Sequence, residues 1–211
     1  MAACPLCSDR PAKRYCPAKG DRICAVCCGT NREIEIDCPG SCPYLRSGRD
    51  YEAEKRDPDP ELTAKAHRFD RAFLYRFSPI LDAISRDVVA EHLQSPWLVD
   101  NDVIEVYKAL TSTMKTLSSG IYYESVPAGS VQQSLFHRLK ALLDVAMQPQ
   151  EAPDQSCLKV TEALDILEFL TFAAQANSGI RPKSRRYLDW LTSMVPVDAG
   201  PELSSGGLIL P

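Results

Sequence analysis

Eight of the nine cysteines lie between residues 4 and 42, and only Cys157 falls outside this stretch. A C-x2-C turn directs two sulfur atoms at one ion, and zinc accepts four thiolates in a tetrahedron. The eight thiols therefore predict about two zinc ions per chain, each in a closed structural site. The predicted ligands are Cys4, Cys7, Cys16, Cys24, Cys27, Cys28, Cys38 and Cys42.

Two partitions of these ligands fit the spacing. Because neighbouring side chains diverge, Cys27 and Cys28 are expected to serve different ions. In the preferred, cross-braced partition, one zinc binds Cys4, Cys7, Cys24 and Cys27, and the other binds Cys16, Cys28, Cys38 and Cys42. Exchange of Cys27 and Cys28 between the sites is the alternative, and the spacing is compatible with both.

Other chemistries of clustered thiols fit the sequence less well. An iron–sulfur cluster also takes four thiolates and stays open as an alternative. Disulfides are typical of secreted chains, but the N-terminus lacks the basic and apolar stretches of a secretory signal. A catalytic zinc usually has histidine or carboxylate ligands and an open position, whereas His67, His92 and His137 all lie outside the cysteine-rich stretch.

The residues between the cysteines indicate turns. Four of the cysteines are followed directly by proline, and glycine recurs between them, which favours tight loops. Residues 32–36 alternate polar and apolar side chains, which predicts a short, half-buried strand. Large apolar side chains are few in this stretch, so we expect it to fold only with its metal.

The strings CPLC, RYCPAKGDRICAVCCGTNR and IDCPGSCPYL carry a resemblance. They look like the N-terminus of a family of uncharacterised bacterial proteins in which a cysteine-rich module precedes a helical region. Their ligand spacing is distantly similar to that of B-box and HIT-type zinc fingers, which are cross-braced and mostly bind proteins. The resemblance implies zinc at the eight cysteine positions and implies no reaction.

Composition changes along the chain predict four segments. Residues 1–50 form the zinc-binding module, and residues 51–60 are polar, end in two prolines and predict a linker. Residues 61–195 form an all-helical domain, and residues 196–211, rich in proline, glycine and serine, predict a flexible tail.

Apolar residues recur at helical spacing throughout residues 61–195, which predicts a mainly α protein with an irregular bundle of five or six helices. A helix boundary is expected at Ser78-Pro79. Residues 158–176 are apolar on nearly every face and should form a central helix. No apolar run approaches the roughly 18 residues that span a bilayer, so no membrane association is expected.

The charge of the chain bears on its partners. A net charge of -4 gives no global reason to expect nucleic acid. Five basic residues of the module form either a basic face or a solvated rim, namely Arg10, Lys13, Arg14, Lys19 and Arg22. A second basic run forms either a solvated turn or a contact with an acidic surface, and comprises Arg181, Lys183, Arg185 and Arg186.

These features predict a non-enzymatic, cytoplasmic zinc protein. The sequence contains no phosphate-binding glycine loop, Gly-x-Ser-x-Gly elbow or His-Glu-x-x-His motif. We expect an adaptor or scaffold that binds a protein partner through the zinc module and the helical domain. A nucleic-acid-binding regulator that uses the basic residues of the module is the alternative.

Overall fold

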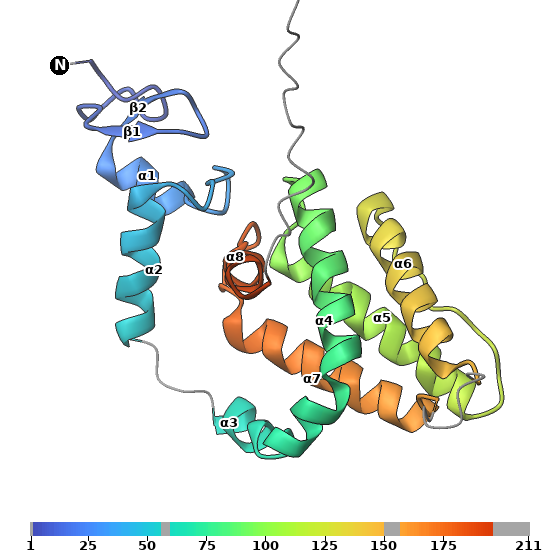
Figure 1. The fold of residues 1–211 in the computed structure, drawn as a ribbon. Helices are drawn as coiled ribbons and strands as arrows, with labels where there is room; N and C mark the ends of the chain where they lie inside the picture. Colours follow the sequence, from blue (N-terminus) through green and yellow to red (C-terminus); the bar gives the residue numbers. More distant parts are fainter. Residues whose placement is uncertain (1, 56–59, 150–156, 196–211) are drawn as a thin grey trace, which may run out of the picture.

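The computed structural model describes residues 2–55, 60–149 and 157–195. A small cysteine-rich module precedes a bundle of helices, and the described residues contain one sheet, of two strands (Figure 1). This confirms the predicted class, mainly α with a small N-terminal module ahead of a helical domain. The predicted tail, residues 196–211, lies outside the described residues.

The module begins with a β-hairpin. Strands β1 (Arg14–Cys16) and β2 (Asp21–Ile23) pair antiparallel, with Tyr15 opposite Arg22. Gly20 closes the turn at φ 64°, a conformation that glycine adopts without a steric penalty. Helices α1 (Ala25–Asn31) and α2 (Pro43–Lys55) follow. The predicted linker therefore begins inside α2, and residues 56–59 lie outside the described residues.

The strand predicted at residues 32–36 is wrong. This segment is a tight turn in which the backbone carbonyl of Asn31 accepts hydrogen bonds from the amides of Ile34, Glu35 and Ile36, at 3.2, 3.1 and 2.9 Å. Glu33 has φ 52°, which no strand contains. The alternation of polar and apolar residues instead results from Ile36 entering the module core while Ile34 stays exposed.

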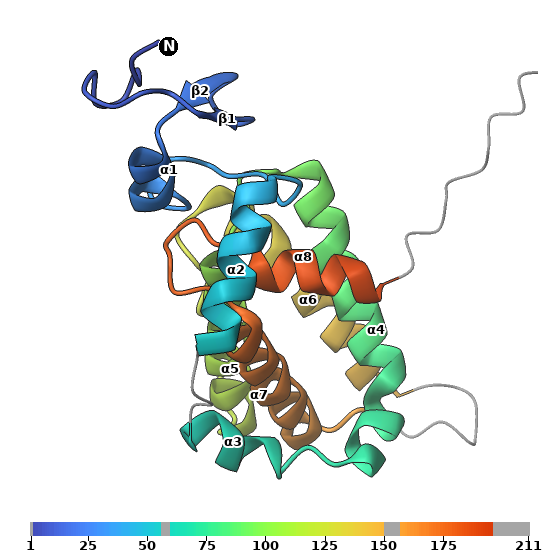
Figure 2. The same ribbon diagram turned by 90° about the vertical axis from the view of Figure 1, so that its left-hand side faces the viewer.

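Six helices of the described residues form the bundle. They are α3 (Pro60–Ala66), α4 (Arg71–Gln94), α5 (Asp100–Ser118), α6 (Ser130–Met147), α7 (Val160–Asn177) and α8 (Arg186–Met194). Helix α7 packs along α5, α6 packs against α4 and α5, and α8 contacts α4, α5 and α7. Helix α2 lies alongside α8, as Figures 1 and 2 both show, so the module rests on one side of the bundle.

The helix boundary predicted at Ser78-Pro79 is also wrong, because α4 continues through Pro79. Proline cannot donate the hydrogen bond that the carbonyl of Tyr75 would accept in a regular helix. The Ser78 hydroxyl donates to that carbonyl at 3.1 Å and replaces the missing donor. The helix begins instead at Asp70, whose carboxylate accepts from the amide of Phe73 at 2.8 Å.

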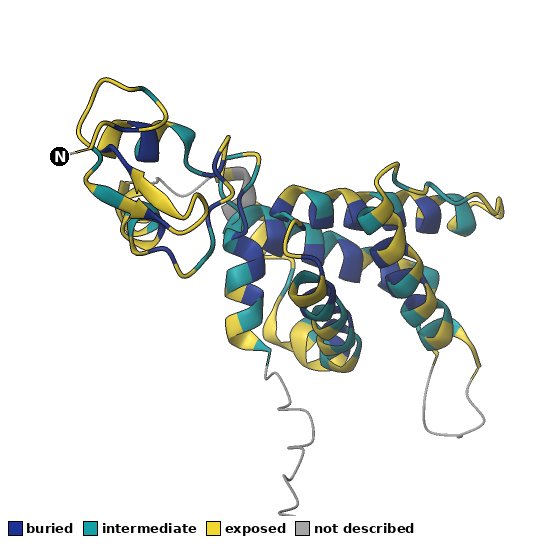
Figure 3. Ribbon diagram, turned by 90° about the horizontal axis from the view of Figure 1, so that it is seen from above, coloured by how far each residue is buried: buried dark blue, intermediate teal, exposed yellow. Residues whose placement is uncertain are grey.

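The protein has two separate cores (Figure 3). The bundle core is aliphatic and aromatic, and includes Tyr107, Leu110, Phe136, Ile166 and Tyr187. The buried residues of the module core are seven cysteines, Ile23, Ile36 and Leu45. The two clusters share no residue, so each is stabilised by its own contacts. None of the helices in the described part of the chain combines the length and apolarity needed to cross a membrane.

Candidate metal centre

Four sulfur atoms of the module meet at one point. The Sγ atoms of Cys4, Cys7, Cys24 and Cys27 all lie within 4.8 Å of one another. The first two come from the loop before β1, and the others come from the start of α1. The structure thus brings together one of the two predicted ligand sets, and this set contains Cys27 and not Cys28.

Backbone hydrogen bonds set this geometry. The carbonyl of Cys4 accepts from the amides of Cys7 at 3.3 Å and of Ser8 at 2.7 Å, which curls the loop so that both thiols face inward. Ser8 completes the curl at φ 55°. Cys24 is the N-cap of α1, and its Sγ accepts from the amide of Cys27 at 3.3 Å.

Backbone amides favour a thiolate at Cys4. Burial raises the pKa of Cys4, but amide donors from Cys24, Leu6 and Cys7 outweigh it and lower that pKa to about 6. The pKa of Cys27 is raised to about 12, first by its hydrogen bond with Cys24 and then by burial. Four adjacent thiols without a cation cannot all ionise, whereas a coordinated divalent metal deprotonates them.

The distances fit zinc. A tetrahedral ion with Zn–S bonds of about 2.3 Å has S–S edges of about 3.8 Å. Cys7 Sγ lies 4.0 Å from Cys24 Sγ, close to this edge. Cys7 is half-buried and the other three cysteines are buried, so the group can hold a metal away from water. Among the described residues, neither histidine nor carboxylate belongs to the group.

The other four cysteines are buried together in the module core without forming a second group of this kind. Cys16, Cys28, Cys38 and Cys42 are each at most 8% exposed. Burial raises the pKa of Cys38, and the nearby thiols of Cys42 and Cys16 raise it further. Within residues 2–55, 60–149 and 157–195, however, only the first four sulfur atoms gather within 4.8 Å of one another. The second zinc site stays a prediction.

The second basic run of the sequence contacts the module. Arg181 donates to the carbonyls of Gly29 at 3.1 Å and Arg32 at 2.8 Å. The amide of Lys183 donates to the carbonyl of Glu33 at 2.9 Å. Arg185 pairs with Asp37, directly before Cys38 in the chain. The run therefore contacts backbone carbonyls and the acidic side chain of Asp37, all of which belong to the module of the same chain.

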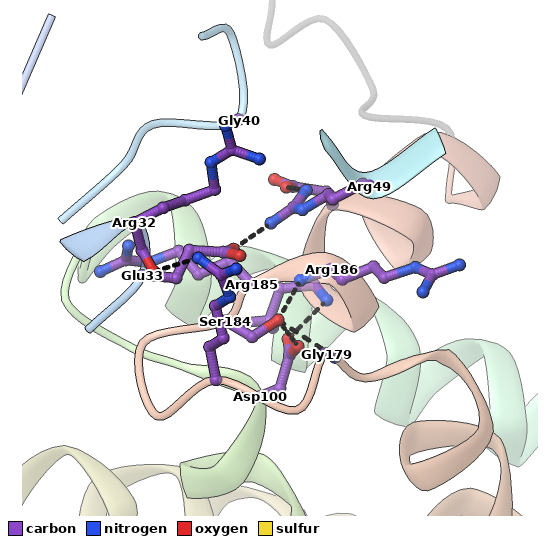
Figure 4. Close-up of polar contacts among 12 residues, drawn as sticks. Arg32, Glu33, Gly40, Arg49, Asp100, Gly179, Ser184, Arg185 and Arg186 are labelled. Carbon is purple, nitrogen blue, oxygen red and sulfur yellow. Dashed lines mark hydrogen bonds and ion pairs between the residues drawn. The ribbon is translucent and has the colours of Figure 1, made fainter. Parts of the chain in front are cut away.

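A half-buried arginine of α2 forms a clamp that the sequence did not indicate. Arg49 donates to Glu33 Oε1 at 2.7 Å and to Asp189 Oδ2 at 2.6 Å, so it joins the turn before Cys38 to helix α8 (Figure 4). The side chains of Arg49 and Glu33 are 15% and 6% exposed. Helix α8 also approaches Gly40 closely, because an added Cβ there would lie 2.8 Å from Asp189 Oδ1.

The loop that carries the basic run is fixed from the bundle side. Asp100, 2% exposed at the start of α5, accepts from the Ser184 hydroxyl at 2.8 Å and from the amide of Leu188 at 3.2 Å. Burial raises the pKa of Asp100, although these donors oppose the shift. Arg185 also donates to the carbonyl of Leu98 at 3.0 Å. The residues that hold the module are therefore positioned by the bundle core.

The histidines lie away from the thiols. His67 and His137 are exposed on the bundle. His92 is half-buried on α4, and burial lowers its pKa.

Comparison of the chain with protein-family models, with curated proteins and with solved structures finds no match. The resemblance stated above is therefore carried by the cysteine-rich strings themselves, and the structure supports it only in the four-cysteine group that can hold a metal.

Proposed function

We propose that this protein is a cytoplasmic, non-enzymatic zinc protein that acts as an adaptor. The observation that carries the proposal is the group of four sulfur atoms within 4.8 Å of one another, with N–H donors directed at two of them. Four thiolates fill the coordination shell of zinc and leave no position for a substrate. Such an ion stabilises the fold and takes part in no reaction. The protein would therefore act by binding a partner at its surface.

A second zinc completes the proposal. Cys16, Cys28, Cys38 and Cys42 are the ligands, and their burial in one core supports this assignment. A closed Zn2+ would bring their sulfur atoms together and deprotonate them. This second ion would then stabilise the turns that contact the bundle, because Cys28 directly precedes Gly29 and Cys38 directly follows Asp37.

The purified chain is expected to carry about two zinc ions and to be colourless, because eight thiols fill two closed sites. Elemental analysis and native mass spectrometry measure this content. A Cys28→Ser variant should retain one ion, and Cys157→Ser, which changes an exposed cysteine, should retain both. Iron together with a broad absorption near 400 nm would replace the zinc assignment with an iron–sulfur cluster.

The exposed surface supports a protein partner. Large apolar side chains stay more than half exposed on both parts of the chain, and those include Tyr15, Val26, Leu93, Trp97 and Met194. Aromatic side chains and methionine are enriched in protein interfaces. The docked module places its exposed residues and those of the bundle in one fixed arrangement.

The β-hairpin supports nucleic-acid binding as a second candidate, because Lys13, Lys19 and Arg22 are exposed beside Tyr15.

The dependence of binding on salt separates the two candidates. For the adaptor we expect partner capture to persist at about 1 M salt, where charges more than about 3 Å apart are screened. DNA or RNA binding that falls steeply with salt, and disappears in a Lys13→Ala/Lys19→Ala/Arg22→Ala variant, would instead favour the second candidate. Arg86→Ala on α4 is the matched control, because Arg86 is an exposed cation of the bundle.

A further inference from the structure

The bundle contains an open cavity of about 680 Å³ between α5 and α7. Lys65 of α3 and Phe69, which follows that helix, border it at one end. Ligand pockets for small molecules typically measure about 300 to 1,000 Å³. The lining residues all lie between Lys65 and Gln175, in the helical domain, and none belongs to the cysteine-rich module.

One wall of the cavity is apolar. Phe69, Leu164 and Phe172 line it, and all three are half-buried although each is large. The rings of Phe69 and Phe172 lie 5.8 Å apart between centroids, and Phe69 also packs edge-on against Phe169 at 5.2 Å. The aromatic cluster therefore holds the wall in place and presents apolar surface to the cavity.

The rim of the cavity is cationic. Lys65 reaches it from α3, and Lys108 and Lys115 reach it from α5, where a separation of seven residues places both on one helix face. The one acidic residue of the lining, Glu168, is paired with Arg68 at 2.6 Å. Lys108 also pairs with Glu105, but both side chains are about half exposed, so the free energy of this ion pair is small. The rim therefore has an excess of positive charge.

We propose that this cavity binds a small amphiphilic anion, with its acidic headgroup at the three lysines and its apolar body on Phe69, Leu164 and Phe172. An apolar wall below a cationic rim is complementary to such a molecule in both shape and charge. The proposal goes beyond the zinc-dependent adaptor role, because the lining residues belong to the bundle alone.

Calorimetry of the zinc-loaded, full-length chain with laurate and with dodecyl phosphate, both as monomers, tests the proposal. Saturable binding of one molecule per chain is expected, and the tighter ligand identifies the headgroup. A Lys108→Ala/Lys115→Ala variant should bind about tenfold more weakly or worse, because charge-assisted contacts are lost. Ser112→Phe, which places a bulky ring in the lining, should abolish binding with the thermal unfolding curve unchanged.

Arg86→Ala removes an exposed cation that lies outside the cavity lining, and should leave the affinity unchanged. Dodecyltrimethylammonium, which has the same chain and the opposite charge, should not bind. The proposal is overturned if this cation binds as tightly as laurate, if the double lysine variant keeps full affinity, or if neither anion binds saturably.

Discussion

A Cys24→Ser variant is expected to lose the fold of the module and to retain that of the bundle. Serine keeps the N-cap of α1, so the change removes the metal ligand and little else. Structural zinc contributes roughly 10 to 16 kcal/mol to folding in small zinc domains. Ile23, Ile36 and Leu45 are the large apolar side chains buried in the module, too few to fold it without metal.

Most of the helical circular dichroism should survive this change. Helices α1 and α2 have 7 and 13 residues and together are shorter than α4, which has 24. The bundle core contains no residue of the module, so its burial does not depend on the metal. Amide NMR signals should collapse for the module and persist for α4 to α7, and a strong chelator should reproduce the result with the natural chain.

Cys157→Ser is the control, because this cysteine is exposed and lies in the helical domain. It should leave both the zinc content and the spectrum unchanged. Loss of the bundle signals together with those of the module would contradict the prediction. It would mean that the contacts of the basic run make the two parts one cooperative unit.

The first ligand group could be predicted because its signal is local. A C-x2-C spacing fixes the direction of two sulfur atoms through hydrogen bonds within a few residues, as the loop of Cys4 and the N-cap of Cys24 show. The helical bundle could be predicted for a similar reason, since an apolar stripe must face other elements wherever they lie.

The errors occurred where a single contact overrode a local rule. Proline normally ends a helix, but the hydroxyl of Ser78 satisfies the carbonyl of Tyr75 and α4 continues. Alternating side chains normally indicate a strand, but three amides share the carbonyl of Asn31 and form a turn. The Ser78 hydroxyl bond and the shared Asn31 carbonyl both depend on the folded geometry, so neither is visible in the proline signal or in the alternation from which the elements were predicted.

The docking of the module could not be predicted, because its contacts join distant residues. Arg49 and Asp189 are 140 positions apart, and Arg181 and Gly29 are 152 apart. A basic run has the same sequence whether it faces water or an acidic surface. Whether the run faces water or the module depends on the position of α8, which the bundle core sets through Asp100 and Ser184.

An Arg49→Ala variant is expected to destabilise the docked structure by about 3 kcal/mol, because it leaves the carboxylate of Glu33 buried and unpaired. Urea unfolding of the zinc-loaded chain, followed by tryptophan fluorescence, measures the change, since Trp190 lies next to Asp189 in α8.

The matched control is Lys108→Ala. Lys108 pairs with Glu105 at 3.1 Å on the surface of α5, where both side chains are about half exposed. Removal of such an exposed pair should cost less than about 1 kcal/mol. If Arg49→Ala costs no more than this control, the clamp does not stabilise the protein.

A double-mutant cycle of Arg49→Ala with Asp189→Ala separates docking from the stability of the module itself. Arg49 belongs to the module and Asp189 to the bundle, so the two changes interact only if α2 lies on α8. Because Asp189 is 35% exposed, solvent screening should limit the coupling free energy to about 1 kcal/mol. Additive effects would show that the module does not rest on α8 in solution, whereas coupling would show that Arg49 of α2 contacts Asp189 of α8 there.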